Sequence, residues 1–178
     1  MSTSANPKPG SDRVRRVLVV DDNPAIRADF MKVLCPTGPS HERLKALEVS
    51  VFGDTEAVPA QAGGFVVDAA SQGREALAAV ERMLRAKTPY ALAFIDMRMP
   101  PGWDGVETSA RIWQSDPAIQ IVICSAYSDY SWHDVIQRLQ RPDLRFLQKP
   151  FEAKDALELA YSLTSKWLLA RGRSSARV

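Results

Sequence analysis

The sequence has few cysteines, no long apolar run and little net charge, and each of these absences disfavours a class of protein. Its 178 residues contain two cysteines, Cys35 and Cys124, and neither belongs to a Cys-x-x-Cys pair. Disulfide scaffolds and structural zinc sites are therefore disfavoured, and a reducing compartment fits best. No run of about 18 apolar residues is present to cross a bilayer, and the polar opening from Met1 to Asp12 lacks the apolar segment of a secretory signal. We therefore expect a cytoplasmic protein without membrane insertion.

The charge balance also argues against a general nucleic-acid binder. A net charge of +2 supplies no strong positive field, so direct nucleic-acid binding is not expected. The hydrophobic fraction of 46% and the charged fraction of 25% are typical of a globular domain. We expect a disordered leader over residues 1–14, one folded domain over 15–170 and a basic, solvated tail over 171–178.

Short apolar runs alternate with helical patterns along the folded part. Four of the five strand candidates are nearly continuous in apolar residues, as strands buried on both faces should be; the five are Val17–Val20, Phe65–Ala70, Ala91–Ile95, Ile119–Cys124 and Arg145–Leu147. The helix candidates are Pro24–Leu34, with Asn23 as its N-cap, Arg74–Arg85, Val106–Gln114, Ser131–Leu139 and Ala153–Leu169. The alternation predicts an α/β fold, a doubly wound five-stranded parallel sheet with five flanking helices.

One segment interrupts this alternation, between the first helix and the second strand. The stretch over residues 36–64 is too long for an ordinary helix-to-strand connection, so we interpret it as an insertion. Apolar residues at helical spacing predict a short helix over His41–Phe52, followed by a Pro/Ala/Gly linker. The insertion either packs against the core or forms a docking surface for a partner, and the sequence leaves both interpretations open.

Polar side chains follow four of the predicted strands, at the point where each strand ends. They are Asp21 and Asp22, Asp96, Ser125, and Lys149 followed by Pro150. Because the carboxyl ends of parallel strands meet at one edge of a sheet, we expect these groups to lie close together. Three carboxylates at one place repel one another unless a cation joins them, and an all-oxygen site suits Mg²⁺.

This set of residues has the chemistry of phosphoryl transfer. Asp96 can act as a nucleophile that forms an acyl phosphate. Lys149 can place a positive charge on one phosphoryl oxygen, and the Ser125 hydroxyl can donate a hydrogen bond to another. Each residue alone also has an ordinary structural explanation: the Asp-Asp-Asn-Pro turn, for example, is a common helix cap. Their ordered occurrence after successive strands favours the functional interpretation.

These motifs together resemble the response-regulator receiver family of two-component signalling, which has the flavodoxin-like fold predicted above. The resemblance covers about Arg15 to Leu169 and rests on the segments VLVVDDNPAIR, AFIDMRMPPGWDG, IVICSAYSD and FLQKPF. It implies that Asp96 is the phosphoacceptor. It further implies a Mg²⁺ site formed by Asp21, Asp22, Asp96 and the backbone carbonyl of Arg98.

The resemblance also implies a two-state switch. Ser125 and Lys149 would bind the phosphoryl group, and the Lys149–Pro150 bond is expected to be cis. Ser125 would move toward that group while the switch aromatic, Phe146, turns inward, which changes the surrounding surface. The donor would be a sensor histidine kinase or a phosphotransfer protein, and the chain would be no enzyme beyond its own phosphorylation and autodephosphorylation.

Two features depart from the usual receiver pattern. The loop after Asp96 is one residue longer than usual, and it contains Trp103, which we expect to pack in the core or at its rim. With the insertion, this loop resembles a receiver subgroup that is often attached to hybrid histidine kinases. The residues after Trp167 are too few for an output domain, so we expect either a separate protein as output partner or a chain that is part of a larger protein.

The sequence supports one alternative function and disfavours two others. The chain could act as a phosphate-independent interaction module or phosphate sink through the 36–64 insertion. A phosphatase of the haloacid-dehalogenase type would need a second aspartate two residues after Asp96, where Arg98 stands. His133 could suggest a phosphotransfer histidine, but its setting is typical of the start of a helix.

Overall fold

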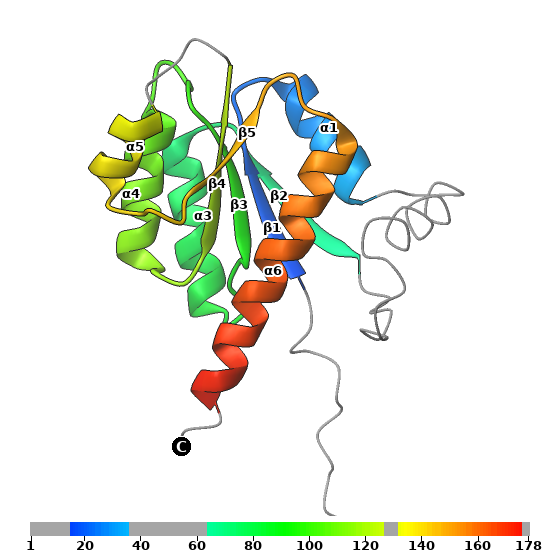
Figure 1. Ribbon diagram of the computed structural model, residues 1–178, viewed down its shortest axis with the longest axis vertical. Helices are drawn as coiled ribbons and strands as arrows, with labels where there is room; N and C mark the ends of the chain where they lie inside the picture. Colours follow the sequence, from blue (N-terminus) through cyan, green and yellow to red (C-terminus); the bar gives the residue numbers. More distant parts are fainter. Residues whose placement is uncertain (1–14, 36–63, 127–131, 176–178) are drawn as a thin grey trace, which may run out of the picture.

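The computed structural model describes residues 15–35, 64–126 and 132–175, and these contain five strands and five helices (Figure 1). In chain order the elements are β1 Arg15–Val20, α1 Pro24–Leu34, β2 Phe65–Ala70, α3 Gly73–Arg85, β3 Leu92–Asp96, α4 Gly105–Ser115, β4 Gln120–Ser125, α5 Trp132–Leu139, β5 Arg145–Gln148 and α6 Ala153–Ser175. The expected leader, the segment 36–63 and its helix over His41–Phe52 lie outside the described residues. No described helix is long and apolar enough to cross a membrane.

The strands form one parallel sheet in the order β2-β1-β3-β4-β5. Helices α1 and α6 cover one face, and α3, α4 and α5 cover the other (Figure 1). The chain order reverses beside β1, whose neighbours are β2 on one side and β3 on the other. The predicted doubly wound fold is therefore confirmed. The ends of β1 and β3 lie at the position where such sheets bind ligands.

Strand alternation divides the core between the two faces. In β1, Leu18 and Val20 pack under α3, α4 and α5, whereas Val17 and Val19 pack under α1 and α6. All five residues of β3 are buried, because β3 lies between β1 and β4 with helices on both sides. The nearly continuous apolar runs of the sequence thus mark strands that are covered on both faces.

The helix boundaries agree with the sequence prediction to within one residue, except at the end of the chain. The predicted N-cap is confirmed, since the Asn23 side chain accepts a hydrogen bond from the Ala25 amide at 2.9 Å. The last helix was predicted to end at Leu169, but α6 continues to Ser175. Residues 171–175 of the expected tail are therefore helical. The Arg171 guanidinium lies 4.8 Å from the Trp167 ring, one turn earlier, and this pair favours the additional turn.

Candidate functional site

The acidic residues of the candidate site converge at the carboxyl ends of β1 and β3. Asp21, Asp22 and Asp96 each offer a carboxylate oxygen, and these atoms lie within 4.8 Å of one another. Asp21 is 2% exposed and Asp96 is 9% exposed, whereas Asp22 is exposed. The Asp21 and Asp96 carboxylates are thus largely shielded from solvent, and the Asp22 carboxylate lies on the solvent side of the cluster.

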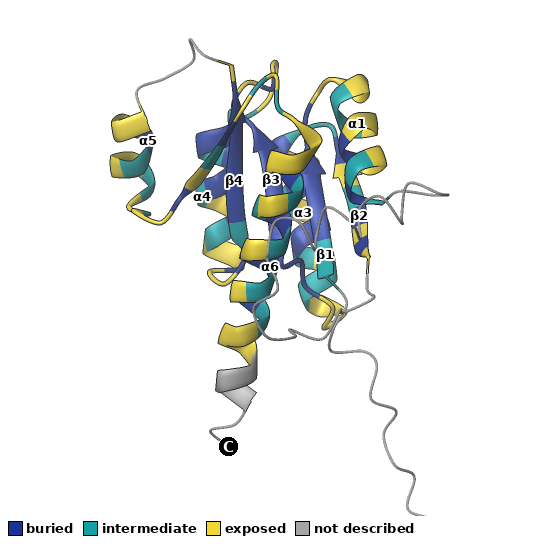
Figure 2. Cartoon of the chain, turned by 45° about the vertical axis from the view of Figure 1, so that its right-hand side comes forward, coloured by how far each residue is buried: buried dark blue, intermediate teal, exposed yellow. Residues whose placement is uncertain are grey.

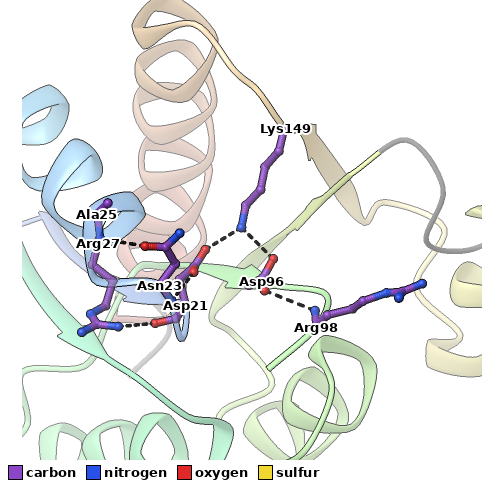
Figure 3. A network of polar contacts seen from close by, with 7 residues as sticks. All are labelled: Asp21, Asn23, Ala25, Arg27, Asp96, Arg98 and Lys149. Carbon is purple, nitrogen blue, oxygen red and sulfur yellow. Dashed lines mark hydrogen bonds and ion pairs between the residues drawn. The ribbon is translucent and has the colours of Figure 1, made fainter. Parts of the chain in front are cut away.

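Lys149 lies between two of these carboxylates (Figure 3). Its Nζ donates to Asp21 Oδ2 at 2.6 Å and to Asp96 Oδ1 at 2.7 Å. Lys149 follows the last residue of β5. Its peptide bond to Pro150 is cis, as the family resemblance implied. A lysine from one edge of the sheet therefore reaches the acidic residues that follow the two central strands.

Burial and the neighbouring charges act in opposite directions on the pKa values of Asp96 and Lys149. Burial raises the pKa of the Asp96 carboxyl above its ordinary value, although hydrogen bonding and the charge of Lys149 lower it in part. Burial would lower the pKa of Lys149, but its hydrogen bonds to Asp21 and Asp96 and their charges outweigh burial and raise it. Lys149 therefore keeps its positive charge beside Asp96.

The two loops that carry the aspartates are fixed by backbone contacts. The Asn23 amide donates to Asp21 Oδ1 at 2.9 Å, and the Arg27 guanidinium donates to the Asp21 backbone carbonyl (Figure 3). The Arg98 amide donates to Asp96 Oδ2 at 3.3 Å. Asn23 was predicted only as a helix cap and Arg27 was not predicted, because their contacts depend on how α1 packs beside β1.

Gly105 is a further site residue that the sequence analysis missed. It begins α4, and its amide donates to the Met97 carbonyl at 2.9 Å. A Cβ atom at this position would lie 2.5 Å from the Asp96 carbonyl oxygen. Only glycine lets the helix start this close to the Asp96 backbone, and the Asp-Gly sequence before a helix was the available signal.

The two predicted switch residues lie on β4 and β5. Ser125 ends β4, is fully buried, and donates its hydroxyl hydrogen bond to the Ala126 carbonyl at 2.9 Å. Phe146 lies in β5, half-buried against the core under α5, and its ring centroid is 4.2 Å from that of Trp132. The structure thus places both residues on strands on the same side of β3, without showing a change between two states.

The acidic cluster fits a divalent metal ion by its donor chemistry. Its three carboxylates supply oxygen donors, which Mg²⁺ prefers, and two of them are largely buried. Asp21, Asp22 and Asp96 are therefore the side chains that could hold the ion. The Arg98 backbone lies in the loop that leaves Asp96, next to the cluster.

Comparison with known proteins supports the same assignment. A sequence profile of the response regulator receiver domain matches residues 56–161, which is more than half of the chain. The match includes Asp96 and Lys149, whereas Asp21 and Asp22 precede it and are placed by β1. The transcriptional regulator NtrC of Salmonella typhimurium is 33% identical over 96 residues, which cover 54% of this chain and 19% of NtrC. The chain thus spans about a fifth of that relative.

Solved structures show the same fold at lower identity. A CheY-like receiver domain from Methanospirillum hungatei is 20% identical, with a TM-score of 0.61 and coverage of 86% of this chain and 96% of the other. The NtrX receiver domain from Brucella abortus is 22% identical, with a TM-score of 0.56 and coverage of 84% and 98%. From the profile match, the sheet order and the site at its edge, the chain belongs to the response regulator receiver domain family of two-component signalling.

Proposed function

We propose that this receiver domain accepts a phosphoryl group on Asp96, with Mg²⁺ as cofactor, and so switches a protein-binding surface. The observation that carries the proposal is the position of Lys149 Nζ, 2.7 Å from Asp96 Oδ1 and 2.6 Å from Asp21 Oδ2, beside three carboxylates. A carboxylate held next to a cation site and a fixed ammonium group matches the needs of phosphoryl transfer, which depends on positioning and charge stabilisation.

The residues have distinct roles in the proposed reaction. An Asp96 carboxylate oxygen attacks the phosphorus, the bond between phosphorus and the donor's leaving group breaks, and an acyl phosphate forms. Lys149 is released from one carboxylate contact and pairs with a phosphoryl oxygen. Asp21, Asp22 and Asp96, with the Arg98 carbonyl, would hold Mg²⁺, which would supply positive charge to offset the phosphoryl oxygens.

The proposed output follows from the position of the switch residues. Ser125 turns its hydroxyl from the Ala126 carbonyl toward the phosphoryl group, and Phe146 moves into the space that this opens. The surface formed by α5 and β5 then changes its shape for an output protein. The proposed donor is a sensor histidine kinase or a phosphotransfer protein, and the chain itself catalyses only its own phosphorylation and dephosphorylation.

The test is phosphorylation of Asp96→Asn. Wild-type protein, incubated with Mg²⁺ and acetyl phosphate or a phosphorylated kinase, should acquire one base-labile phosphoryl group, and the variant should acquire none. Asp116→Asn is the matched control, because Asp116 is also buried, at 5% exposure, but follows α4 at the opposite end of the sheet. Labelling of Asp96→Asn at the wild-type level would exclude Asp96 as the phosphoacceptor.

A further inference from the structure

The ring of Trp103 is held between two helices by two arginines. Trp103 lies half-buried in the loop between β3 and α4. The Arg74 guanidinium of α3 lies 4.9 Å from the ring centroid, and the Arg111 guanidinium of α4 lies 4.3 Å from it. We call these three residues the Trp103 clamp. Such stacks are favourable because the ring face attracts a cation, and Trp provides the strongest ring.

The start of α3 packs closely against the Trp103 ring. A Cβ atom on Gly73, the first residue of α3, would lie 3.2 Å from Trp103 Cε3 and 2.2 Å from Thr108 Oγ1. The side-chain amide of Gln72 donates to the Pro100 carbonyl at 3.3 Å. The start of α3 therefore supports the β3–α4 loop at Pro100 as well as at Trp103.

This loop starts and ends at the phosphoacceptor. It leaves β3 at Asp96, passes through Arg98, and returns at Gly105, whose missing Cβ allows contact with the Asp96 backbone. The clamp holds the loop just before that return. A shift of Trp103 would therefore move the loop backbone between Asp96 and Gly105, which includes Arg98.

We propose that Trp103 is a positioning residue for the cation site, because its clamp fixes the loop that carries the Arg98 backbone beside Asp96. The inference rests on the proposed function, since it assigns the loop to the same site. It predicts that loss of the ring weakens Mg²⁺ binding even though Trp103 is not among the residues that offer a ligand atom. Residues hydrogen-bonded directly to metal ligands change metal affinity by about 10- to 100-fold, and Trp103, which acts through the loop, is expected at the low end of that range.

The experiment compares Trp103→Ala with Trp113→Ala in the full chain. Trp113 is the matched control, because it is also half-buried and also carries a stacked arginine: the Arg141 guanidinium lies 4.5 Å from its ring centroid. It lies near the end of α4 that is distant from Asp96, where its Nε1 donates to the Ile119 carbonyl. By calorimetric titration with MgCl₂, Trp103→Ala should raise the Mg²⁺ Kd by about tenfold. Trp113→Ala should leave it within about twofold, although both variants lower the Tm. Trp103→Phe, which keeps a ring, should bind Mg²⁺ with intermediate affinity.

The outcomes separate this inference from the proposed function. Equal Mg²⁺ Kd values for Trp103→Ala and wild type, in protein that is labelled on Asp96, overturn the positioning role and leave the function intact. A wild-type chain that is never labelled overturns the function, while a Trp103-dependent Mg²⁺ Kd would still support the positioning role. If Trp103→Ala does not fold, the pair Arg74→Met and Arg111→Met decides: a Kd unchanged from wild type overturns the inference.

Discussion

The two helices that follow β3 and β4 on the same face of the sheet are held very differently. Helix α4 is capped by the Asp104 side chain, touches the Asp96 backbone at Gly105, and buries five of its residues, Gly105, Val106, Thr108, Ser109 and Ile112. Helix α5 has eight residues, of which only Val135 is buried, and it meets β5 through the Trp132–Phe146 ring pair. Figure 2 shows this contrast, with most of α5 at the surface.

The difference indicates which flank can move. Regions with few buried apolar contacts open at lower free energy than the core around them. The α4 flank is well packed and carries the loop that follows Asp96, so it fits the fixed side of the proposed switch. The α5 flank is sparsely packed and lies against Phe146, so it fits the responsive side.

The largest effect is expected from Gly105→Ala. The new Cβ would lie 2.5 Å from the Asp96 carbonyl oxygen and 3.0 Å from Met97 Cα, and backbone atoms cannot rotate away. Alanine favours a helix over glycine by about 1 kcal/mol, so the clash must exceed that gain. With a clash near the upper end of the usual cost of about 1–3 kcal/mol, we expect a net loss of about 2 kcal/mol in the free energy of unfolding, measured in urea, together with slower labelling of Asp96.

The control for this variant is Gly64→Ala. Gly64 precedes β2, and nothing lies within 4 Å of its ideal Cβ position. Its substitution should change the free energy of unfolding by less than about 0.5 kcal/mol. Equal stability of the two variants would contradict the view that α4 is fixed tightly against the backbone of Asp96.

The carboxyl-edge site was predictable because it depends on topology alone. Asp21, Asp96 and Lys149 each follow or end a strand in the sequence, and parallel pairing brings such positions to one edge whatever the details of packing. The strand centres and the N-cap at Asn23 were predictable because they depend on local sequence patterns. Periodicity and turn chemistry are sufficient for features of this kind.

The contacts that distinguish the two flanks were not predictable. The stacking of Arg74 and Arg111 on Trp103 depends on the distance between α3 and α4, and the Trp132–Phe146 pair depends on where α5 crosses β5. The tight approach at Gly105 is likewise set by how α4 packs. Such contacts join residues that are distant in sequence, and no periodic pattern encodes their geometry. The end of α6 was missed because residues 171–178 were interpreted as a basic, solvated tail, whereas the one glycine among them, Gly172, costs a helix only about 1 kcal/mol.

A smaller effect is expected from Trp132→Ala. Removing the ring should lower the free energy of unfolding by about 1 kcal/mol, because Trp132 is 38% exposed and the substitution mainly removes its pairing with the Phe146 ring. The destabilisation should fall on α5 itself. Amide hydrogen exchange should become faster around Val135 and remain unchanged around Ile112 in α4.

Trp132→Phe serves as the control for this variant, since it keeps an aromatic partner for Phe146. Its exchange rates in α5 should lie close to those of wild type. If Trp132→Ala accelerates exchange equally in α4 and α5, then the two flanks open together and the proposed division into a fixed and a responsive side is wrong.

The smallest effect is expected from Glu107→Gln, which tests what holds the clamp on the α4 side. Arg111 Nε donates to Glu107 Oε1 at 2.6 Å, but both side chains are more than 40% exposed. Exposed pairs one helical turn apart contribute about 0.5 kcal/mol or less to the free energy of unfolding. Asp29→Asn is the control: it removes the exposed Asp29–Lys32 pair of α1 and should cost equally little.

Arg111 can still stack on Trp103 without Glu107 as partner, so the Mg²⁺ Kd of Glu107→Gln should stay at the wild-type value. A rise in Kd as large as that of Trp103→Ala would mean that the ion pair, and not the ring, positions Arg111, and the fixed flank would then depend on salt concentration.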